Sequence, residues 1–373
     1  MILIEASNLV PQAPLSENIP SDFEHQVNPT GPARRLANTG RVAHRARRLR
    51  QWSVVAVSTI ALSLGSCGNS PLPNSTTEVT PSQSQSPIAV ATDKLQVVTT
   101  FLPITQFTKA VAGDRAEVTQ LLPTNVGPHD YQATPEDAQK LSKADVLVKN
   151  GLEMEEFLED LVKHAGNANL KVIDSSQGVK TITTESIEDS THGYDHDHGT
   201  YNPHIWVDPK RVIRQVENIR DGLVAADPEG KAVYTANAAA YIEKLRRLDV
   251  ETAKQLQPYS GRTFVAFHDF ASYFAESYNL KVTFLVDVPE ENPSPKDVKR
   301  IIDTVKETDL KTLLTEPQGE QEAFAALAKD LNVEVSTFDP METGSPAALQ
   351  SDYYFTTMRQ NIKTLVTAFT GQL

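Results

Sequence analysis

Four of the chain's nine histidines lie close together, in the stretch HGYDHDHGTYNPHIW at residues 192–206. His192, His196 and His198 alternate with aspartate, glycine and tyrosine, whereas His204 follows a proline. Short histidine-rich tracts bind metal ions weakly. The stretch could therefore form one metal site, two metal sites or only a polar loop, and the choice depends on partners elsewhere in the sequence.

Three further residues that could bind a metal stand at the ends of strand-like or loop-like segments. They are His129 in LLPTNVGPHDY, His268 in VAFHDFASYF and Asp339 in VSTFDPM. Separately, each has an ordinary explanation as a surface histidine, a core histidine or a turn aspartate. Together with His204 they supply three imidazoles and one carboxylate, a four-coordinate set that suits tetrahedral Zn²⁺. Glu316 is by default a residue that supports a ligand from behind or lies on the surface, and the alternative is that it is a carboxylate ligand. Separately, replacing one imidazole by a second carboxylate would favour the harder Mn²⁺.

The elements that must position these residues alternate between strand-like and helix-like patterns. One array begins at LQVVTTF (95–101) and a second at TFVAFHD (263–269). Such alternation predicts βαβ units with parallel sheets, so the fold class is α/β with two (β/α)4 lobes. Ligands of open α/β sheets bind beyond the carboxyl ends of the strands, which is where His268 and Asp339 stand.

A long helix is expected between the two arrays, over residues 227–258. Asp227 is a suitable N-cap and Pro228 suits the first helical position. Apolar residues recur at helical spacing until Pro258 and Gly261 end the pattern. A helix of about 25–30 residues would measure about 40 Å. We expect it to join the two lobes as a rigid link, with the metal site in the cleft between the lobes.

The N-terminal region has the features of a bacterial secretion signal. A cationic run at 41–51 precedes an apolar run at 52–64, and the segment LGSC ends at Cys67, the single cysteine. Thirteen apolar residues are too few for a membrane-spanning helix, which needs about twenty. A short signal anchor or a buried apolar segment is the alternative. The Leu-x-x-Cys ending resembles a lipobox, which implies that Cys67 is lipidated and tethers the protein to the membrane.

Composition shifts divide the chain into five segments. Residues rich in Ser, Thr, Pro, Asn and Gln follow Cys67, and such a segment acts as a flexible spacer. The expected segments are a leader at 1–66, a linker at 67–93, an N-terminal lobe at 94–226 with a histidine-rich loop at 188–202, the linking helix at 227–258 and a C-terminal lobe at 259–373. The net charge of −13 argues against a nucleic-acid-binding role, which needs a basic face.

Five ordered motifs, GPHDY, NPHIWVDP, FHDFASYFAESYNL, TEPQ and FDP, resemble those of the metal solute-binding proteins of bacterial ABC transporters. The resemblance covers about residues 94–373. It implies two (β/α)4 lobes bridged by one long helix, and a metal held by His129, His204, His268 and Asp339. Manganese receptors of this family carry Glu at the third ligand position, so His268 points to zinc. Pro128 stands where some zinc receptors have a ligand Glu, and Asn202 where Asp is common.

The function that this resemblance implies is an extracytoplasmic, lipid-anchored zinc receptor that delivers Zn²⁺ to an ABC permease. It would act as a monomer and catalyse no reaction. His192, His196 and His198 would form an accessory metal loop of lower affinity, because a mobile loop pays an ordering cost. The alternatives are the same fold with manganese or iron, a zinc hydrolase, and a metal-storage or adhesin surface protein. No HExxH-type motif supports the hydrolase.

Overall fold

The computed structural model describes residues 94–129, 131–183, 200–289, 292–317 and 321–371. All of them belong to one compact unit, Gln85–Leu373. The predicted leader, the linker, Cys67 and the three histidines of the expected accessory loop (His192, His196 and His198) lie outside the described residues. Among the helices that are described, none has the length and apolar character needed to cross a membrane.

A parallel four-stranded sheet forms the centre of the N-terminal lobe, with the strand order β2-β1-β3-β4. The strands are β1 (Leu95–Thr99), β2 (Ala116–Gln120), β3 (Val146–Lys149) and β4 (Lys171–Asp174), and the helices are α1 (Leu102–Ala112), α2 (Pro135–Ser142) and α3 (Leu158–Ala165). Helix α2 begins with a capping box, in which Thr134 and Asp137 each satisfy the other's backbone N–H. Helix α1 is almost entirely buried.

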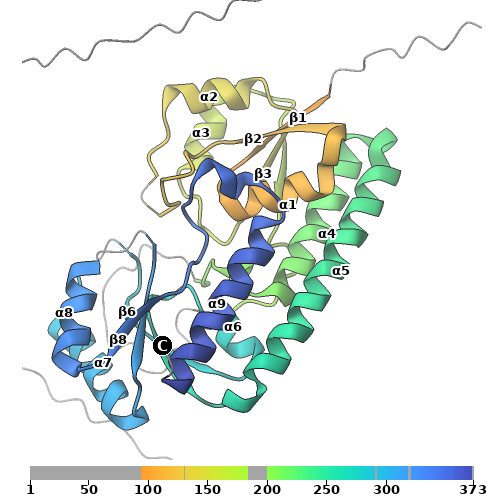
Figure 1. Cartoon of the computed structure of the whole chain (residues 1–373). Coiled ribbons are helices and arrows are strands. Elements are labelled where there is room, and N and C mark those ends of the chain that lie inside the picture. The colour runs from red at the N-terminus through yellow and green to blue at the C-terminus, as the bar shows by residue number, and fades with distance from the viewer. Residues whose placement is uncertain (1–93, 130, 184–199, 290–291, 318–320, 372–373) are drawn as a thin grey trace, which may run out of the picture. The chain divides into compact units, whose positions relative to one another are not determined.

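A second parallel sheet repeats this topology with the order β6-β5-β7-β8. Its strands are β5 (Thr263–His268), β6 (Lys281–Val286), β7 (Thr312–Thr315) and β8 (Glu334–Thr337), and its helices are α6 (Ser272–Ser277), α7 (Pro295–Thr308) and α8 (Gln321–Leu331). Another capping box, made by Ser294 and Asp297, starts α7. Two lobes with four parallel strands each confirm the predicted α/β class (Figure 1).

Two long helices follow the N-terminal sheet, α4 (Pro209–Ala226) and α5 (Lys231–Leu256), and α5 leads into the second sheet and so links the lobes. Helix α5 has 26 residues and packs against α1 and α4. It starts later than the sequence predicts, because Asp227 caps a separate 3-10 turn (Pro228–Gly230) by accepting from the backbone N–H of Gly230. Arg115 also pairs with Asp227, with 2.7 Å between Nε and Oδ2.

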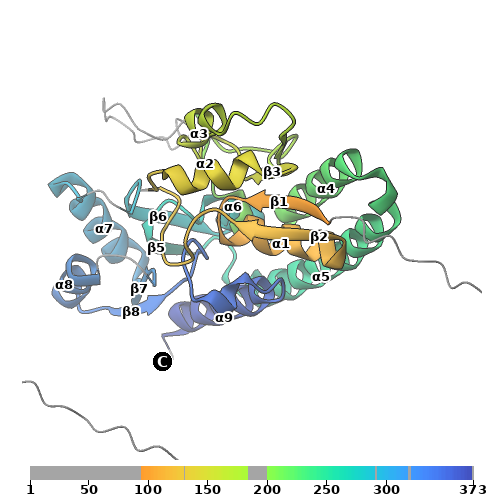
Figure 2. The ribbon, with the colours of Figure 1, turned by 90° about the horizontal axis from the view of Figure 1, so that it is seen from above.

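The C-terminal helix α9 (Tyr353–Thr370) is a second link between the lobes. After β8 the chain crosses to the N-terminal lobe, where Gln106 Nε2 donates to the carbonyl of Ala348 (2.7 Å). Helix α9 then packs along α5 and reaches β7 and β8 (Figures 1 and 2). One hydrophobic core therefore runs through the N-terminal sheet, α4, α5, α9 and part of the second sheet, and a smaller core lies beneath α7 and α8.

Candidate metal centre

His204 lies in a rigid, buried loop that is set by its neighbours in sequence. It follows Pro203 and precedes a 3-10 turn, Ile205–Val207. Its backbone N–H donates to Asn202 Oδ1 (2.9 Å), and its Nδ1 lies 3.0 Å from the same oxygen. An amide oxygen only accepts, so Nδ1 carries the proton and Nε2 keeps its lone pair. Burial, together with the nearby His268 and His129, lowers the pKa of His204 to about 3 against the opposing effect of Glu342, so the ring is neutral.

His268 is the last residue of β5 and is fully buried. Its Nδ1 donates to Glu316 Oε1 (2.6 Å), which also accepts from the His268 backbone N–H at 3.3 Å. Burial alone would lower the pKa of His268, but the carboxylates of Glu316 and Glu342 overcome that effect and raise the pKa to about 10. Glu316 therefore holds the ring by Nδ1 and leaves Nε2 to face the other histidines.

His129 lies in the loop between β2 and α2, and Glu342 in the loop after β8. The side chain of His129 is 5% exposed and that of Glu342 is 1% exposed. Burial alone would raise the pKa of Glu342, yet His129 and His268 hold it well below its usual range. The carboxylate is thus ionised beside three imidazoles.

Four ligand-type atoms converge within 4.8 Å of one another: Nε2 of His129, His204 and His268, and Oε1 of Glu342. The Nε2 of His204 is 3.3 Å from the Nε2 of both other histidines. Glu342 Oε1 lies 3.5, 3.4 and 3.5 Å from His129, His204 and His268 respectively. Two of these ligands come from each lobe, so the group lies between the lobes.

The spacing of these atoms matches a tetrahedral zinc site. Zinc bonds of about 2.0–2.1 Å place neighbouring ligand atoms of a tetrahedron about 3.3–3.4 Å apart. Five of the six edges of this group measure 3.3–3.5 Å. The sixth edge, between Nε2 of His129 and Nε2 of His268, is at most 4.8 Å, so the four atoms could surround one ion.

Asp339, the carboxylate ligand expected from the sequence, does not belong to this group. Its Oδ1 accepts from the backbone N–H of Met341 (2.7 Å), and its backbone is bound on both sides by Asn361 of α9. Met341 has a positive φ of 65°, which turns the chain so that Glu342 supplies the carboxylate instead. Asp339 anchors the loop, and the structure brings together only three of the four predicted ligands.

Glu342 was not predicted as a ligand. In the sequence it is marked only by being a second acidic residue in the same loop, three positions after Asp339. The loop is held against the N-terminal lobe: Trp206 Nε1 donates to the carbonyl of Pro340 (2.8 Å), and the Gly344 N–H donates to the carbonyl of Thr124 (2.6 Å). These contacts between distant residues fix which acid faces the histidines. Glu316, the alternative ligand, contacts Nδ1 of His268 and is also outside the group.

The fold and the site together define a class of protein, the two-lobed α/β metal-binding proteins with a long connecting helix. The chain belongs to the ZnuA family, described as "Zinc-uptake complex component A periplasmic", whose model matches residues 97–368.

Individual relatives agree with this family. The chain is 32% identical over 279 residues to the zinc-binding lipoprotein AdcA of Streptococcus pneumoniae, which covers 74% of this chain and 56% of AdcA. It is 31% identical to the manganese-binding lipoprotein MntA of Halalkalibacterium halodurans, over 73% of this chain and 87% of MntA. A crystal structure of ZnuA matches with a TM-score of 0.63 and 31% identity, over 74% of this chain and 99% of that one. The chain thus spans just over half the length of AdcA.

Proposed function

We propose that this protein is a zinc receptor that captures Zn²⁺ outside the cytoplasm and delivers it to an ABC permease. The ligands would be His129, His204, His268 and Glu342. The observation that carries the proposal is the spacing of their four ligand atoms: five of the six distances are 3.3–3.5 Å, which suits a tetrahedral zinc ion. The names of the zinc-binding relatives support the same ion.

This set of ligands is better suited to binding and carrying a zinc ion than to catalysis. A catalytic zinc site keeps one coordination position open for water or substrate. Three histidines and one glutamate already supply four ligands. We therefore infer that the protein is not an enzyme, and that Zn²⁺ is its cargo. Release would require some of these ligands to separate when the receptor docks on the permease.

The anchoring of the receptor follows from its N-terminal sequence. Lipidation at Cys67 would place residues 67–93 as a spacer between the membrane and the lobes, with the body acting as a monomer. The relatives AdcA of S. pneumoniae and MntA are both named lipoproteins, which supports this arrangement. His192, His196 and His198 would gather zinc with lower affinity beside the main site.

Competitive titration with Zn²⁺ and Mn²⁺ tests the proposed ion. The full chain is stripped with a chelator and refilled, and His268→Glu is measured in parallel. We expect wild type to bind one tight Zn²⁺ and to prefer it over Mn²⁺, and His268→Glu to shift the preference toward Mn²⁺. Equal or tighter binding of Mn²⁺ by wild type would contradict the zinc assignment.

Manganese is the second candidate because the chain is 31% identical to a manganese-binding lipoprotein. Three nitrogen ligands and only one carboxylate favour zinc over manganese in this comparison. Several tight zinc ions per chain in the same titration would instead indicate a storage role.

A further inference from the structure

Asn202 lies between the two lobes, immediately behind the proposed metal ligands. It is 3% exposed. On one side, its Oδ1 accepts from His204, as described above. On the other side, its Nδ2 donates to both the backbone carbonyl and Oδ2 of Asp269, each at 2.8 Å. Asp269 directly follows His268, so one side chain joins the loops of two ligands that come from different lobes.

Only an amide satisfies all the partners of this side chain. Oδ1 faces two donors on His204, and Nδ2 faces two oxygens of Asp269. The hydrogen-bonding pattern therefore fixes which end of the amide is oxygen. An aspartate at position 202 could still hold His204, but its second oxygen would meet the two oxygens of Asp269 in a buried site.

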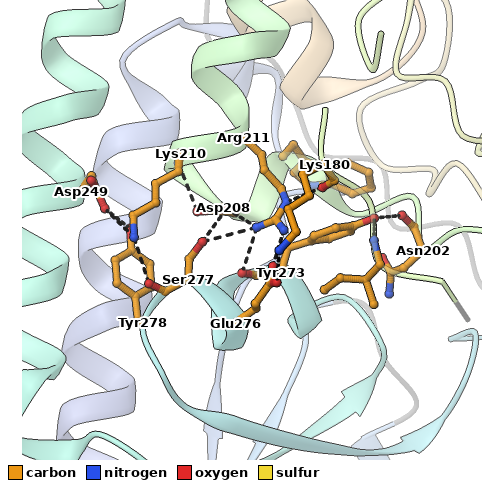
Figure 3. A network of polar contacts seen from close by, with 12 residues as sticks. Lys180, Asn202, Asp208, Lys210, Arg211, Asp249, Tyr273, Glu276, Ser277 and Tyr278 are labelled. Atoms are coloured by element: carbon orange, nitrogen blue, oxygen red, sulfur yellow. Dashed lines mark hydrogen bonds and ion pairs between the residues drawn. The ribbon is translucent and has the colours of Figure 1, made fainter. Parts of the chain in front are cut away.

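The backbone of Asn202 is held by Tyr273 of α6. The Tyr273 hydroxyl donates to the carbonyl of Asn202 (2.6 Å) and accepts from the backbone N–H of Ile182 at 3.1 Å (Figure 3). The Asn202 N–H in turn donates to the carbonyl of Ile182 (3.1 Å). The guanidinium of Arg211 lies over the Tyr273 ring, 4.4 Å from its centroid, and pairs with Asp208 at 2.7 Å. Helices α4 and α6 thus clamp this segment.

We propose that Asn202 is a positioning residue that sets zinc affinity by holding the His204 and His268 loops in register across the two lobes. This inference rests on the proposed function and extends it to a residue that does not touch the metal. Asn202 fixes the tautomer of His204 and, through Asp269, the distance between the two imidazoles. Tyr273 supports it from α6.

The test measures zinc affinity by chelator competition in the full chain, together with thermal unfolding with and without Zn²⁺. We expect Asn202→Ala to weaken zinc binding by about 10- to 100-fold, as loss of an outer-shell partner does. Asn202→Asp should weaken it as well. The double variant Asn202→Asp, Asp269→Asn reverses the hydrogen bond between the two side chains, and the amide oxygen introduced at position 269 can still accept from Ser272. It should recover part of the lost affinity.

A matched pair of tyrosines separates positioning from general stability. Tyr273→Phe removes the hydroxyl beside Asn202, whereas Tyr278→Phe removes a hydroxyl of the same network that donates to Asp249 at 3.1 Å (Figure 3). Tyr273→Phe should weaken zinc binding by up to about tenfold, the usual range for one hydrogen bond. Tyr278→Phe should leave affinity unchanged, even if it lowers the melting temperature.

The outcomes distinguish this inference from the proposed function. If wild type binds no tight zinc, the proposed function fails. If wild type binds zinc tightly but Asn202→Ala stays within about twofold of it, the positioning role is wrong. Equal effects of Tyr273→Phe and Tyr278→Phe on affinity, or an Asn202→Ala variant that melts earlier yet gains as much stability from zinc as wild type, would also overturn it.

Discussion

At the scale of single residues, His268 is the histidine of the site whose pKa the neighbouring carboxylates raise. It lies between two buried carboxylates, Glu316 on Nδ1 and Glu342 near Nε2. These carboxylates raise the pKa of His268 to about 10. At neutral pH the metal-free ring therefore carries a second proton, on Nε2, in addition to the proton that Nδ1 donates to Glu316. A metal ion needs the lone pair of Nε2 and must displace that proton. In the proposed zinc site, metal binding and proton release would therefore be linked.

We expect zinc binding at pH 7 to release about one proton, and zinc affinity to rise as the pH is raised from about 6 to about 8. The sign follows from the raised pKa, because the competing proton is bound more weakly as the pH rises. Calorimetric titration in buffers of different ionisation enthalpy measures the released proton. Glu316→Gln removes one carboxylate and should reduce the release. A proton count near zero in wild type would contradict this linkage.

The two acids of the last loop have different roles and should respond differently to substitution. Glu342→Ala should weaken zinc binding by more than about 100-fold, beyond the range of an outer-shell change. Asp339→Ala loses the turn contact to Met341. It should lower the melting temperature, and it should weaken zinc binding much less than Glu342→Ala does. Chelator competition and thermal unfolding of both variants make the comparison. If Asp339→Ala weakens zinc binding more than Glu342→Ala does, Asp339 is the carboxylate ligand, as the sequence predicts.

Sequence patterns could identify the three histidines because each stands at a strand end or in a Pro-containing loop. The choice between Asp339 and Glu342 could not be made in the same way. It depends on a left-handed residue, Met341, and on hydrogen bonds to Trp206 and Thr124, which are more than a hundred positions away.

At the scale of elements, Asp227 organises the turn between the two long helices. Its carboxylate contacts Arg115, the Gly230 N–H and the Tyr234 hydroxyl. The Arg115 guanidinium holds the pKa of Asp227 at about 2. The sequence predicted Asp227 as the N-cap of the long helix, but in the structure it caps the 3-10 turn Pro228–Gly230 that precedes α5. The same carboxylate also contacts Arg115 and the Tyr234 hydroxyl. The helix pattern predicted the length of α5 well and its first residue less well.

Asp227→Ala should cost about 1–2 kcal/mol of unfolding free energy, as loss of a cap typically does. Zinc affinity should not change, since the turn does not contact the metal ligands. Because the pKa of Asp227 is lowered on folding, its contribution is present above about pH 4 and is lost as the pH falls toward about 2. Denaturant unfolding at pH 7 and at pH 3 measures both effects. An equal loss of stability at both pH values would contradict the assigned role.

At the scale of the whole molecule, one core and two helical links join the lobes. The sequence indicated α5 as the link but assigned α9 to the second array of βα units. Helix α9 packs against α1 and α5 because the chain crosses to the N-terminal lobe after β8. The sequence pattern of a single segment does not predict such a crossing. The continuous core and the metal group, with ligands from both lobes, make the lobes thermodynamically dependent on each other.

We therefore expect the two lobes to unfold in one transition that zinc shifts as a unit. At free zinc a thousandfold above Kd the stabilisation should be about 4 kcal/mol. Calorimetry with and without zinc measures the transition, and the metal-free protein is the control. Two separate transitions, of which zinc moves only one, would show that the lobes are independent.

The crossing of the chain after β8 has a consequence for the order in which the protein can fold. Gln106 of α1 bonds to Ala348, 242 positions later, and the carboxylate of Glu342 lies in the same crossing segment. Contacts at such separations form slowly and only after the intervening chain exists. A partly synthesised chain therefore has neither a finished core nor a fourth ligand. If the proposed zinc site is correct, tight metal binding therefore requires a chain that extends through Glu342 and has folded back onto α1.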